Sequence, residues 1–446
     1  MPPLPQLLTE PLRPPALPRS PAARVKALVV DPMWRSSLLA VVDQAVVSGT
    51  GFATSVLIGR LCSKAELGTY FLALSVVLFI RGMQEQIVSA PYTVYAQRRT
   101  GRELASYTGS VFVHQGLLTL LALAAVVGVG LAAHAGFGAT ILATPGAAVA
   151  LLAAIPFLLF REHLRQFAFA RFRIATVIAI DAAVAVVQLG GLAVLAATGA
   201  LHVASVYAVM GGACLVACGA WLVLGGRPFC VERLRLWPDW IHNWQFGRWM
   251  LASFLVGSSA PYVMPWFVAA LRGAAETGVL AACSTLVGLA NAFVMGVTNH
   301  LSPQAAQAFA AGGTPALRRV LCKTAALFLA TLGIFCLVAI LAGDSLAVLV
   351  YGQKYAGAGA IIAVYALALL ASSLAITAAN GLCAMERPSA NFAADVATLA
   401  ATVVSAALLV PACGVLGAAL AALCGNAASA ALRGAILIAV MRRTLR

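Results

Sequence analysis

The chain has 446 residues, of which 62% are hydrophobic and only 10% are charged. Soluble domains typically carry about a quarter charged residues, so this composition excludes an ordinary water-soluble protein and indicates that lipid surrounds much of the chain. The net charge of +15 does not indicate a nucleic-acid partner, because the basic residues lie in short clusters between apolar runs rather than along one surface.

Residues 1–35 are predicted to form a disordered, Pro-rich, basic cytoplasmic tail. The first 21 residues contain eight prolines and no apolar core of the kind that a secretory signal requires. Such a segment cannot bury enough apolar surface to fold by itself. We therefore expect ordered structure to begin after it.

Twelve apolar runs follow, each close to the roughly 20 residues that a helix needs to cross a bilayer. They predict an all-α membrane protein with a six-helix N-terminal lobe at 36–224 and a six-helix C-terminal lobe at 246–446. The runs lie near residues 37–59, 67–90, 108–131, 139–160, 174–197, 203–224, 246–270, 278–299, 319–342, 360–383, 392–411 and 414–440.

Residues 225–245 are predicted to be a cytoplasmic linker between the lobes. Trp237, Trp240, Ile241 and Trp244 share one face of a helix there. An apolar aromatic stripe beside basic residues is typical of a helix that lies in the membrane interface. We expect this segment to anchor the linker to the lipid surface.

Basic residues are distributed unevenly between the two sides of these spans. With the N-terminus inside, cytoplasmic segments carry 24 Lys and Arg, whereas the opposite side carries four, namely Arg60, Lys64, Arg272 and Lys354. The positive-inside rule then predicts a multi-pass protein of the bacterial cytoplasmic (inner) membrane with both termini cytoplasmic. The outer loops are too short for a catalytic domain, so we expect no enzyme activity.

The two lobes are predicted to be repeats offset by 210 residues. An even number of spans per repeat places the lobes parallel around a central cavity. Two pairs of matching motifs open and close the second span of each lobe, and a third pair interrupts the first span. The matches are Glu66-Leu-Gly68 with Glu276-Thr-Gly278, Ala96-Gln97 with Ala306-Gln307, and Ser48–Gly51 with Ser258–Pro261.

Interrupted helices at equivalent positions of two repeats often border a substrate path. Gly49 and Gly51 in the first span, and Pro261 and Pro265 in the seventh, are therefore candidates for helix bending during transport. The alternative is that Gly and Pro are simply more frequent in membrane helices than in soluble ones.

Charged residues inside the spans are candidates for the functional site, because an isolated charge there costs several kcal/mol. Arg81 and Glu85 are four residues apart and are expected to pair. Under the 210-residue offset Arg81 is equivalent to Asn291, so both should face the central cavity. Arg81 with its expected partner Glu85, and Asn291 in the other lobe, are the predicted substrate site.

Asp43, Asp181 and Asp395, together with Glu85, are candidates for ion coupling. The three aspartates lie near the predicted cytoplasmic start of a span, where the positive end of the helix dipole also stabilises a carboxylate. A structural role therefore stays open. The guanidinium-rich segment 161–173 suits phosphate, and anionic lipid headgroups are its alternative ligand.

The sequence resembles polysaccharide exporters of the O-antigen flippase type in the multidrug/oligosaccharidyl-lipid/polysaccharide (MOP) superfamily. The resemblance covers most of residues 37–440. It rests on Asp43-Gln44, Leu57-Ile-Gly-Arg60, Ala65–Ser75, Ser89–Ala96, Arg161–Asp181 and Asn299-His-Leu-Ser-Pro303.

This resemblance implies a flippase that moves an undecaprenyl-diphosphate-linked oligosaccharide across the inner membrane for surface polysaccharide or lipopolysaccharide synthesis. It adds Asp43, Gln44 and Arg248 to the expected cavity residues, beside Arg81, Glu85 and Asn291. The expected partners are this lipid-linked substrate, membrane lipids and other polysaccharide-assembly membrane proteins, with no nucleic acid. No metal or cofactor is expected, and the ten cysteines show no metal-binding or disulfide spacing.

The main alternative is a cation-coupled multidrug and toxin extrusion antiporter of the same superfamily, for which Asp43, Glu85 and Asp181 would supply the cation site. A major-facilitator transporter shares the six-plus-six repeat but requires a loop pattern that is incomplete here. A membrane glycosyltransferase would need an acidic pair in an aqueous loop, and the sequence has none.

Overall fold

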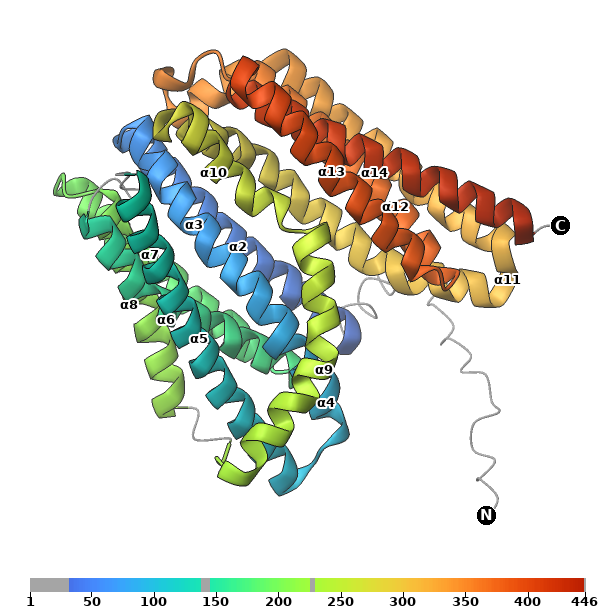
Figure 1. Ribbon diagram of the computed structural model, residues 1–446, viewed down its shortest axis with the longest axis horizontal. Coiled ribbons are helices and arrows are strands. Elements are labelled where there is room, and N and C mark those ends of the chain that lie inside the picture. Colours follow the sequence, from blue (N-terminus) through green and yellow to red (C-terminus); the bar gives the residue numbers. More distant parts are fainter. Residues whose placement is uncertain (1–31, 138–144, 225–228, 445–446) are drawn as a thin grey trace, which may run out of the picture.

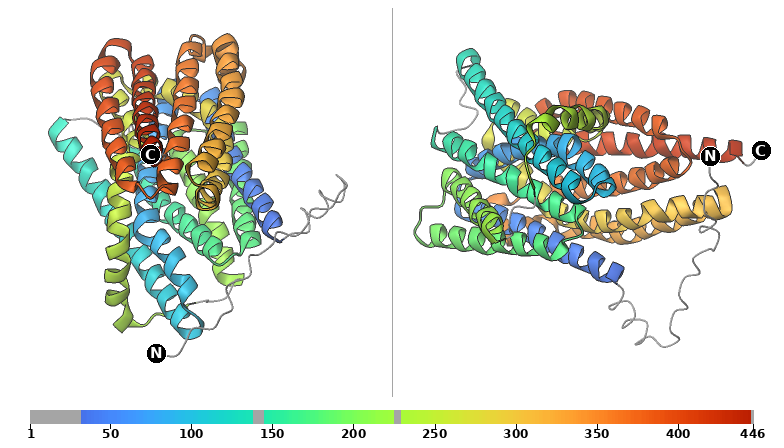
Figure 2. Two further views of the ribbon diagram at one scale, coloured as in Figure 1. Left: turned by 90° about the vertical axis from the view of Figure 1, so that its right-hand side faces the viewer. Right: turned by 90° about the horizontal axis from the view of Figure 1, so that it is seen from below.

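The computed structural model describes residues 32–137, 145–224 and 229–444, so most of the predicted tail lies outside the described residues. Every regular element in these ranges is helical, and the helices form two groups that diverge from one another (Figure 1). The N-terminal lobe contains α2–α8 and the C-terminal lobe α10–α14, with α9 beside the first (Figures 1 and 2).

The helices of the N-terminal lobe lie where the sequence predicts spans, and the helices at 174–197 and 203–224 have the predicted ends. Its elements are α2 (Pro32–Leu61), α3 (Lys64–Gln84), the π-helix η1 (Glu85–Ser89), α4 (Ala90–Tyr95), η2 (Ala96–Arg98), α5 (Gly101–Phe137), α6 (Pro145–Ala170), α7 (Ile174–Ala197) and α8 (Val203–Leu224). α3 starts at a capping box, in which the Ser63 backbone amide donates to Glu66 Oε2 at 3.0 Å and the Glu66 amide donates to Ser63 Oγ at 3.2 Å.

A broken span leads from the N-terminal lobe into the C-terminal lobe. α9 (Arg233–Gly257) and α10 (Ala260–Arg272) meet at 45°. The break falls at Ser258 and Ser259, as the sequence predicts. The remaining elements are α11 (Ala274–Tyr351), η3 (Gln353–Tyr355), α12 (Gly359–Ala384), α13 (Pro388–Cys413) and α14 (Val415–Thr444).

α11 contains two of the predicted spans, which are separated by a kink at Gly312 and Gly313. Gly313 has a φ of +58°, a backbone conformation that glycine adopts without a Cβ clash. Among the described helices, nine are long and apolar enough to cross a membrane, and the α9–α10 pair makes a tenth. With α2 and the second arm of α11, they confirm the predicted fold class of about twelve helices in two lobes.

The two lobes approach most closely where α3 crosses α11. A Cβ on Gly68 would lie 1.8 Å from the Ala274 carbonyl oxygen, and a Cβ on Gly278 would lie 1.9 Å from that of Lys64. Only glycine at both positions allows the backbones to come this near. The predicted repeat motifs Glu66–Gly68 and Glu276–Gly278 therefore contact each other.

The structure differs from the sequence analysis in three elements. α2 is continuous through Gly49 and Gly51, so the predicted interruption of the first span is wrong; the nearby hydroxyl of Thr50 donates to Val46 O at 2.7 Å and stays within the helix. α6 continues to Ala170, ten residues beyond the predicted end of the fourth span.

Most of the predicted linker is also part of a long helix, because α9 begins at Arg233. α9 packs on the N-terminal lobe, where the Tyr107 hydroxyl donates to Asn243 Oδ1 at 2.7 Å and His114 Nε2 lies 2.9 Å from Leu236 O. Trp237 and Trp244 are exposed. Their place in a membrane interface stays a prediction.

Candidate functional site

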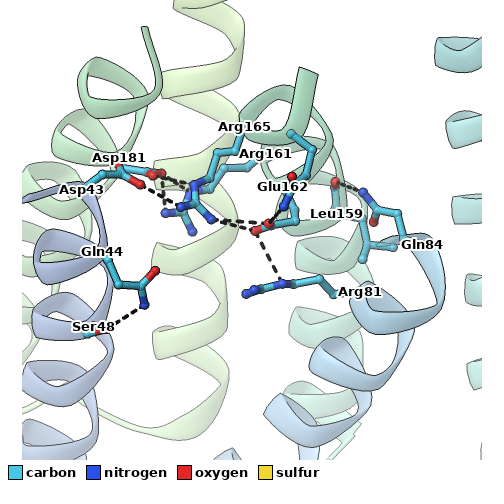
Figure 3. Close-up of polar contacts among 11 residues, drawn as sticks. Asp43, Gln44, Ser48, Arg81, Gln84, Leu159, Arg161, Glu162, Arg165 and Asp181 are labelled. Carbon is cyan, nitrogen blue, oxygen red and sulfur yellow. Dashed lines mark hydrogen bonds and ion pairs between the residues drawn. The ribbon is translucent and has the colours of Figure 1, made fainter. Parts of the chain in front are cut away.

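Six charged side chains from four helices form one ion network inside the N-terminal lobe (Figure 3). We call this set the N-lobe ion network. α6 is its centre, because it supplies three members within two turns. The members are Arg161, Glu162 and Arg165 from α6, Asp43 from α2, Arg81 from α3 and Asp181 from α7.

Arg165 is the hub of the network. Its Nη2 lies 2.9 Å from Asp43 Oδ2, its Nη1 lies 3.1 Å from Glu162 Oε2, and its Nε donates to Asp181 Oδ2. Arg161 Nε donates to the other oxygen of Asp181 at 2.9 Å. A planar guanidinium with several fixed donors suits this contact with three carboxylates, whereas a lysine ammonium would not reach all of them.

The network is buried, and its charges balance. The exposed fractions of Asp43, Glu162, Arg165 and Asp181 are 1%, 5%, 6% and 1%. An unpaired charge at such a place would be strongly unfavourable. Since each of the three arginines faces a carboxylate, the network carries these charges into the lobe without a net charge.

Arg81 is the member with the weakest attachment. Its Nε lies 3.6 Å from Glu162 Oε2, and 40% of its side chain is exposed. Glu162 lies closer to Arg165, whose Nη1 is 3.1 Å from Glu162 Oε2. Arg81 is therefore the cation of the network that an anionic ligand could engage at the lowest cost.

A cavity of about 340 Å³ lies beside the network, between the N-terminal lobe and α11 of the other lobe. Arg161 and Asp181 form part of its wall, and Gln188 and Thr285 add an amide and a hydroxyl. Gln188 Nε2 donates to Thr54 Oγ1 at 2.9 Å. The cavity thus combines a charged wall with hydrogen-bonding groups.

The structure corrects the predicted Arg81–Glu85 pair. Among the described residues Arg81 pairs with Glu162, and Glu85 is exposed without an ion pair. Glu85 is the first residue of the π-helix η1, where the wider turn departs from the regular helix on which the four-residue spacing depends. Glu162 was absent from the predicted set.

The other predicted cavity residues lie outside the network. Asn291 is exposed on α11 and does not line the 340 Å³ cavity. Gln44 is exposed on α2 and donates to Ser48 Oγ at 3.1 Å. Arg248 is exposed on α9, and its guanidinium lies 5.5 Å from the centre of the Trp249 ring. Their roles in binding stay predictions.

The candidates for ion coupling separate into three environments. Asp43 and Asp181 belong to the N-lobe ion network, Glu85 is exposed, and Asp395 on α13 pairs with Arg433 of α14. Each of the three aspartates has an arginine partner. Under the predicted 210-residue offset, Asp43 and Asp181 correspond to Ser253 and Asn391, which carry no charge. The sequence of the second lobe therefore lacks the two aspartates that such a network would need.

The bend candidates also differ. Pro261 is in the first turn of α10 and Pro265 is buried inside it, both next to the 45° break. Gly49 and Gly51 lie in a continuous helix, and a Cβ at either position would meet no atom within 4 Å. Gly51 lines the 340 Å³ cavity. Whether any of these residues bends during transport is a prediction.

Comparison with known proteins shows the fold. No family model and no curated protein matches the chain. Among solved structures, the inward-facing conformation of a multidrug resistance MATE family transporter of the MOP superfamily has a TM-score of 0.74 at 14% identity, covering 90% of this chain and 96% of that one. The lipid II flippase MurJ, in an inward closed conformation, has a TM-score of 0.71 at 14% identity, covering 89% and 86%.

An outward-facing conformation of a MATE family transporter has a lower TM-score of 0.61 at 14% identity, covering 94% of this chain and 98% of that one. The chain therefore has the fold of MOP superfamily transporters, with greater similarity to the inward-facing conformation. These neighbours include both a drug transporter and a lipid flippase, so the fold alone leaves the substrate open.

Proposed function

We propose that the chain is a flippase that moves a lipid-linked oligosaccharide, of the undecaprenyl-diphosphate type, across the bacterial inner membrane for surface polysaccharide or lipopolysaccharide synthesis. The observation that carries this proposal is the N-lobe ion network. Its carboxylates are already neutralised by arginines, while Arg81 remains half-exposed and only loosely paired.

The network suits a phosphate-bearing headgroup through an exchange of partners. When a phosphate oxygen takes the place of Glu162 beside Arg81, Glu162 remains paired with Arg165 at 3.1 Å. The exchange therefore leaves no carboxylate uncompensated. Arginine binds phosphate through parallel charged hydrogen bonds, and Arg161 in the cavity wall offers a second guanidinium nearby.

The polar groups of the cavity suit the sugar next to the phosphates. Ser48, Thr50 and Gln188 line it together with apolar side chains from α3 and α8. Hydroxyl and amide groups both donate and accept hydrogen bonds, which matches the hydroxyl-rich surface of a saccharide.

The alternative function is a cation-coupled multidrug antiporter, and one observation favours it. The Oδ1 atom of Asp43 is buried and makes no hydrogen bond among the described residues. A proton at this oxygen would remove the negative charge of the carboxylate and would weaken the contact with Arg165. In this reading, Asp43 would be the coupling residue rather than a structural member of the network.

Complementation of a bacterial strain that lacks its own O-antigen flippase tests the proposal. Wild type is expected to restore surface glycan, and Arg81→Ala at matched expression is expected to lose it, with partial activity in Arg81→Lys. Arg102→Ala is the matched control, because Arg102 is an 89% exposed arginine whose surface partner is Glu232.

A direct assay avoids dependence on one glycan. Proteoliposomes containing the purified chain are given a fluorescent undecaprenyl-diphosphate saccharide, and its accessibility in the outer leaflet is followed by quenching. Failure of wild type in this assay, combined with proton- or sodium-dependent drug efflux that Asp43→Asn abolishes, would replace the flippase with the antiporter. Equal activity of Arg81→Ala and wild type would exclude Arg81 from the site.

A further inference from the structure

Four basic residues stand out from the charge asymmetry of the chain, because they lie at the end with few cations. These are Arg60, Lys64, Arg272 and Lys354, and they cluster where α2 ends and α3 begins, together with the ends of α10, α11 and α13. We call this region the α2–α3 end. Three of the four donate to backbone carbonyls at the C-terminal ends of helices.

A helix C-terminus attracts such cations for two reasons. Its last four carbonyl groups have no partner within the helix, and they form the negative end of the helix dipole. A lysine or arginine from a neighbouring segment can satisfy both at once. Backbone contacts therefore explain three of the four exceptions to the charge asymmetry.

Two of these contacts cross from one lobe to the other, and they are reciprocal. Arg60, near the end of α2, donates through Nε to Val350 O at 2.6 Å and through Nη2 to Leu349 O, both near the end of α11. Lys354, which follows α11, donates through Nζ to Arg60 O at 3.1 Å and to Cys62 O. The end of each helix thus provides the cation that caps the other.

The surroundings of these contacts are tightly packed. The Tyr351 ring lies against Gly59, where a Cβ would be only 2.3 Å from Tyr351 Cδ1. The Tyr351 hydroxyl lies 3.1 Å from Ser55 Oγ across the lobes. The Lys64 ammonium lies 5.6 Å from the centre of the Tyr355 ring. The lobes are therefore joined at this end by polar contacts around one buried aromatic side chain.

We propose that the reciprocal capping by Arg60 and Lys354 is a latch that holds the α2–α3 end closed in the inward-facing conformation and releases when the transporter opens outward. The inference rests on the proposed transport function, because it requires that the lobes move. It does not depend on which substrate is carried.

The chemistry of the latch suits repeated release. Both cations are exposed, so water can replace their carbonyl partners, and exposed charge contacts contribute little individually. Arg272 provides a comparison within the same chain. Its Nε donates to Val410 O at 3.3 Å, near the end of α13, so the same chemistry joins two helices of one lobe and should not respond to lobe movement.

The latch is tested by the distance between the lobes, measured without substrate. Spin labels are attached to Ala197→Cys, at the end of α7, and to the native Cys413, at the end of α13, with the other cysteines replaced by serine. Arg60→Gln and Lys354→Gln are each expected to increase the population with long distances about threefold, as for the loss of one exposed charged contact. Arg272→Gln is expected to match wild type, and Arg60→Lys to retain most of the closed population.

A second measurement uses the native thiol of Cys62. This residue is only 8% exposed, and burial raises the pKa of its thiol to about 11, so a membrane-impermeant maleimide should label it slowly in the wild type. The latch variants should label faster, with the exposed Cys413 as the reference thiol.

Distance distributions of Arg60→Gln and Lys354→Gln that match that of Arg272→Gln would overturn the latch. Faster labelling of Cys62 without a change in distance would also overturn it, because it would show local loosening only. Neither readout involves a lipid-linked saccharide, so an error in the proposed substrate would leave both results interpretable.

Discussion

Arg165→Leu removes the hub of the N-lobe ion network and leaves its three carboxylates in place. Asp181 keeps its contact with Arg161, and Glu162 keeps its contact with Arg81. Asp43 loses the only ion pair that it makes among the described residues. The perturbation therefore reduces to one uncompensated carboxylate with an exposed fraction of 1%.

Breaking a buried ion pair by removal of one partner costs about 3–5 kcal/mol. We expect Arg165→Leu to lower the free energy of unfolding by this amount. Neutralising the remaining charge should reverse most of the loss, because Asp43→Asn has nearly the same shape as the native side chain. The coupling between the two substitutions should be about 2 kcal/mol or more.

The assay is unfolding in mixed micelles with increasing SDS, followed by tryptophan fluorescence and circular dichroism, for wild type, the two single variants and the double variant. Arg102→Leu is the control, since an exposed pair contributes about 1 kcal/mol or less. The reasoning is refuted if Arg165→Leu is as stable as Arg102→Leu. It is also refuted if Asp43→Asn destabilises the Arg165→Leu chain further.

Three further outcomes are expected. Gly68→Ala and Gly278→Ala should each lower both stability and transport, because the new Cβ would lie within 2 Å of a facing backbone oxygen. Unfolding assays measure the stability and proteoliposome assays the transport. If both variants behave like wild type, the close crossing of α3 and α11 is contradicted. Gly49→Ala should be neutral or add up to about 1 kcal/mol to the free energy of unfolding, since its site is open and α2 is continuous; a large loss of transport would instead indicate that the helix bends there. Tyr107→Phe should cost about 1 kcal/mol and speed hydrogen exchange around Asn243 in α9, and unchanged exchange would show that this bond does not hold α9 to the N-terminal lobe.

The fold was largely predictable from the sequence, because the requirement for membrane-length apolar runs is strong. α7 and α8 have the predicted ends, and the break before α10 falls at the predicted serines. The end of α6 was misplaced because Arg161 and Arg165 interrupt the apolar run, which is also how a cytoplasmic loop begins. Their carboxylate partners come from α2 and α7 and make a longer helix tolerable.

The candidate site was only partly predictable for the same physical reason. Asp43, Arg81 and Asp181 could be identified one by one as charges in apolar segments. Their assembly depends on contacts between different helices, such as that of Arg165 with Asp43, which are 122 positions apart, and no local pattern encodes such contacts. Glu162 could have been suspected from its place between two arginines on one helix.

The contact between Gly68 and Gly278 carries a consequence for the history of the chain. In a symmetric dimer, a residue on the axis touches its own copy. Gly68 and Gly278 lie against each other in that manner, and they are equivalent positions if the two lobes are the repeats that the sequence predicts. In an ancestor that consisted of a single half and formed a symmetric dimer, any substitution at this position would have changed both sides of the contact at the same time. Joining two such halves into one gene would remove that constraint everywhere else. One half could then acquire charged residues around Arg165, whereas the corresponding residue of the other half, Ala375, is apolar.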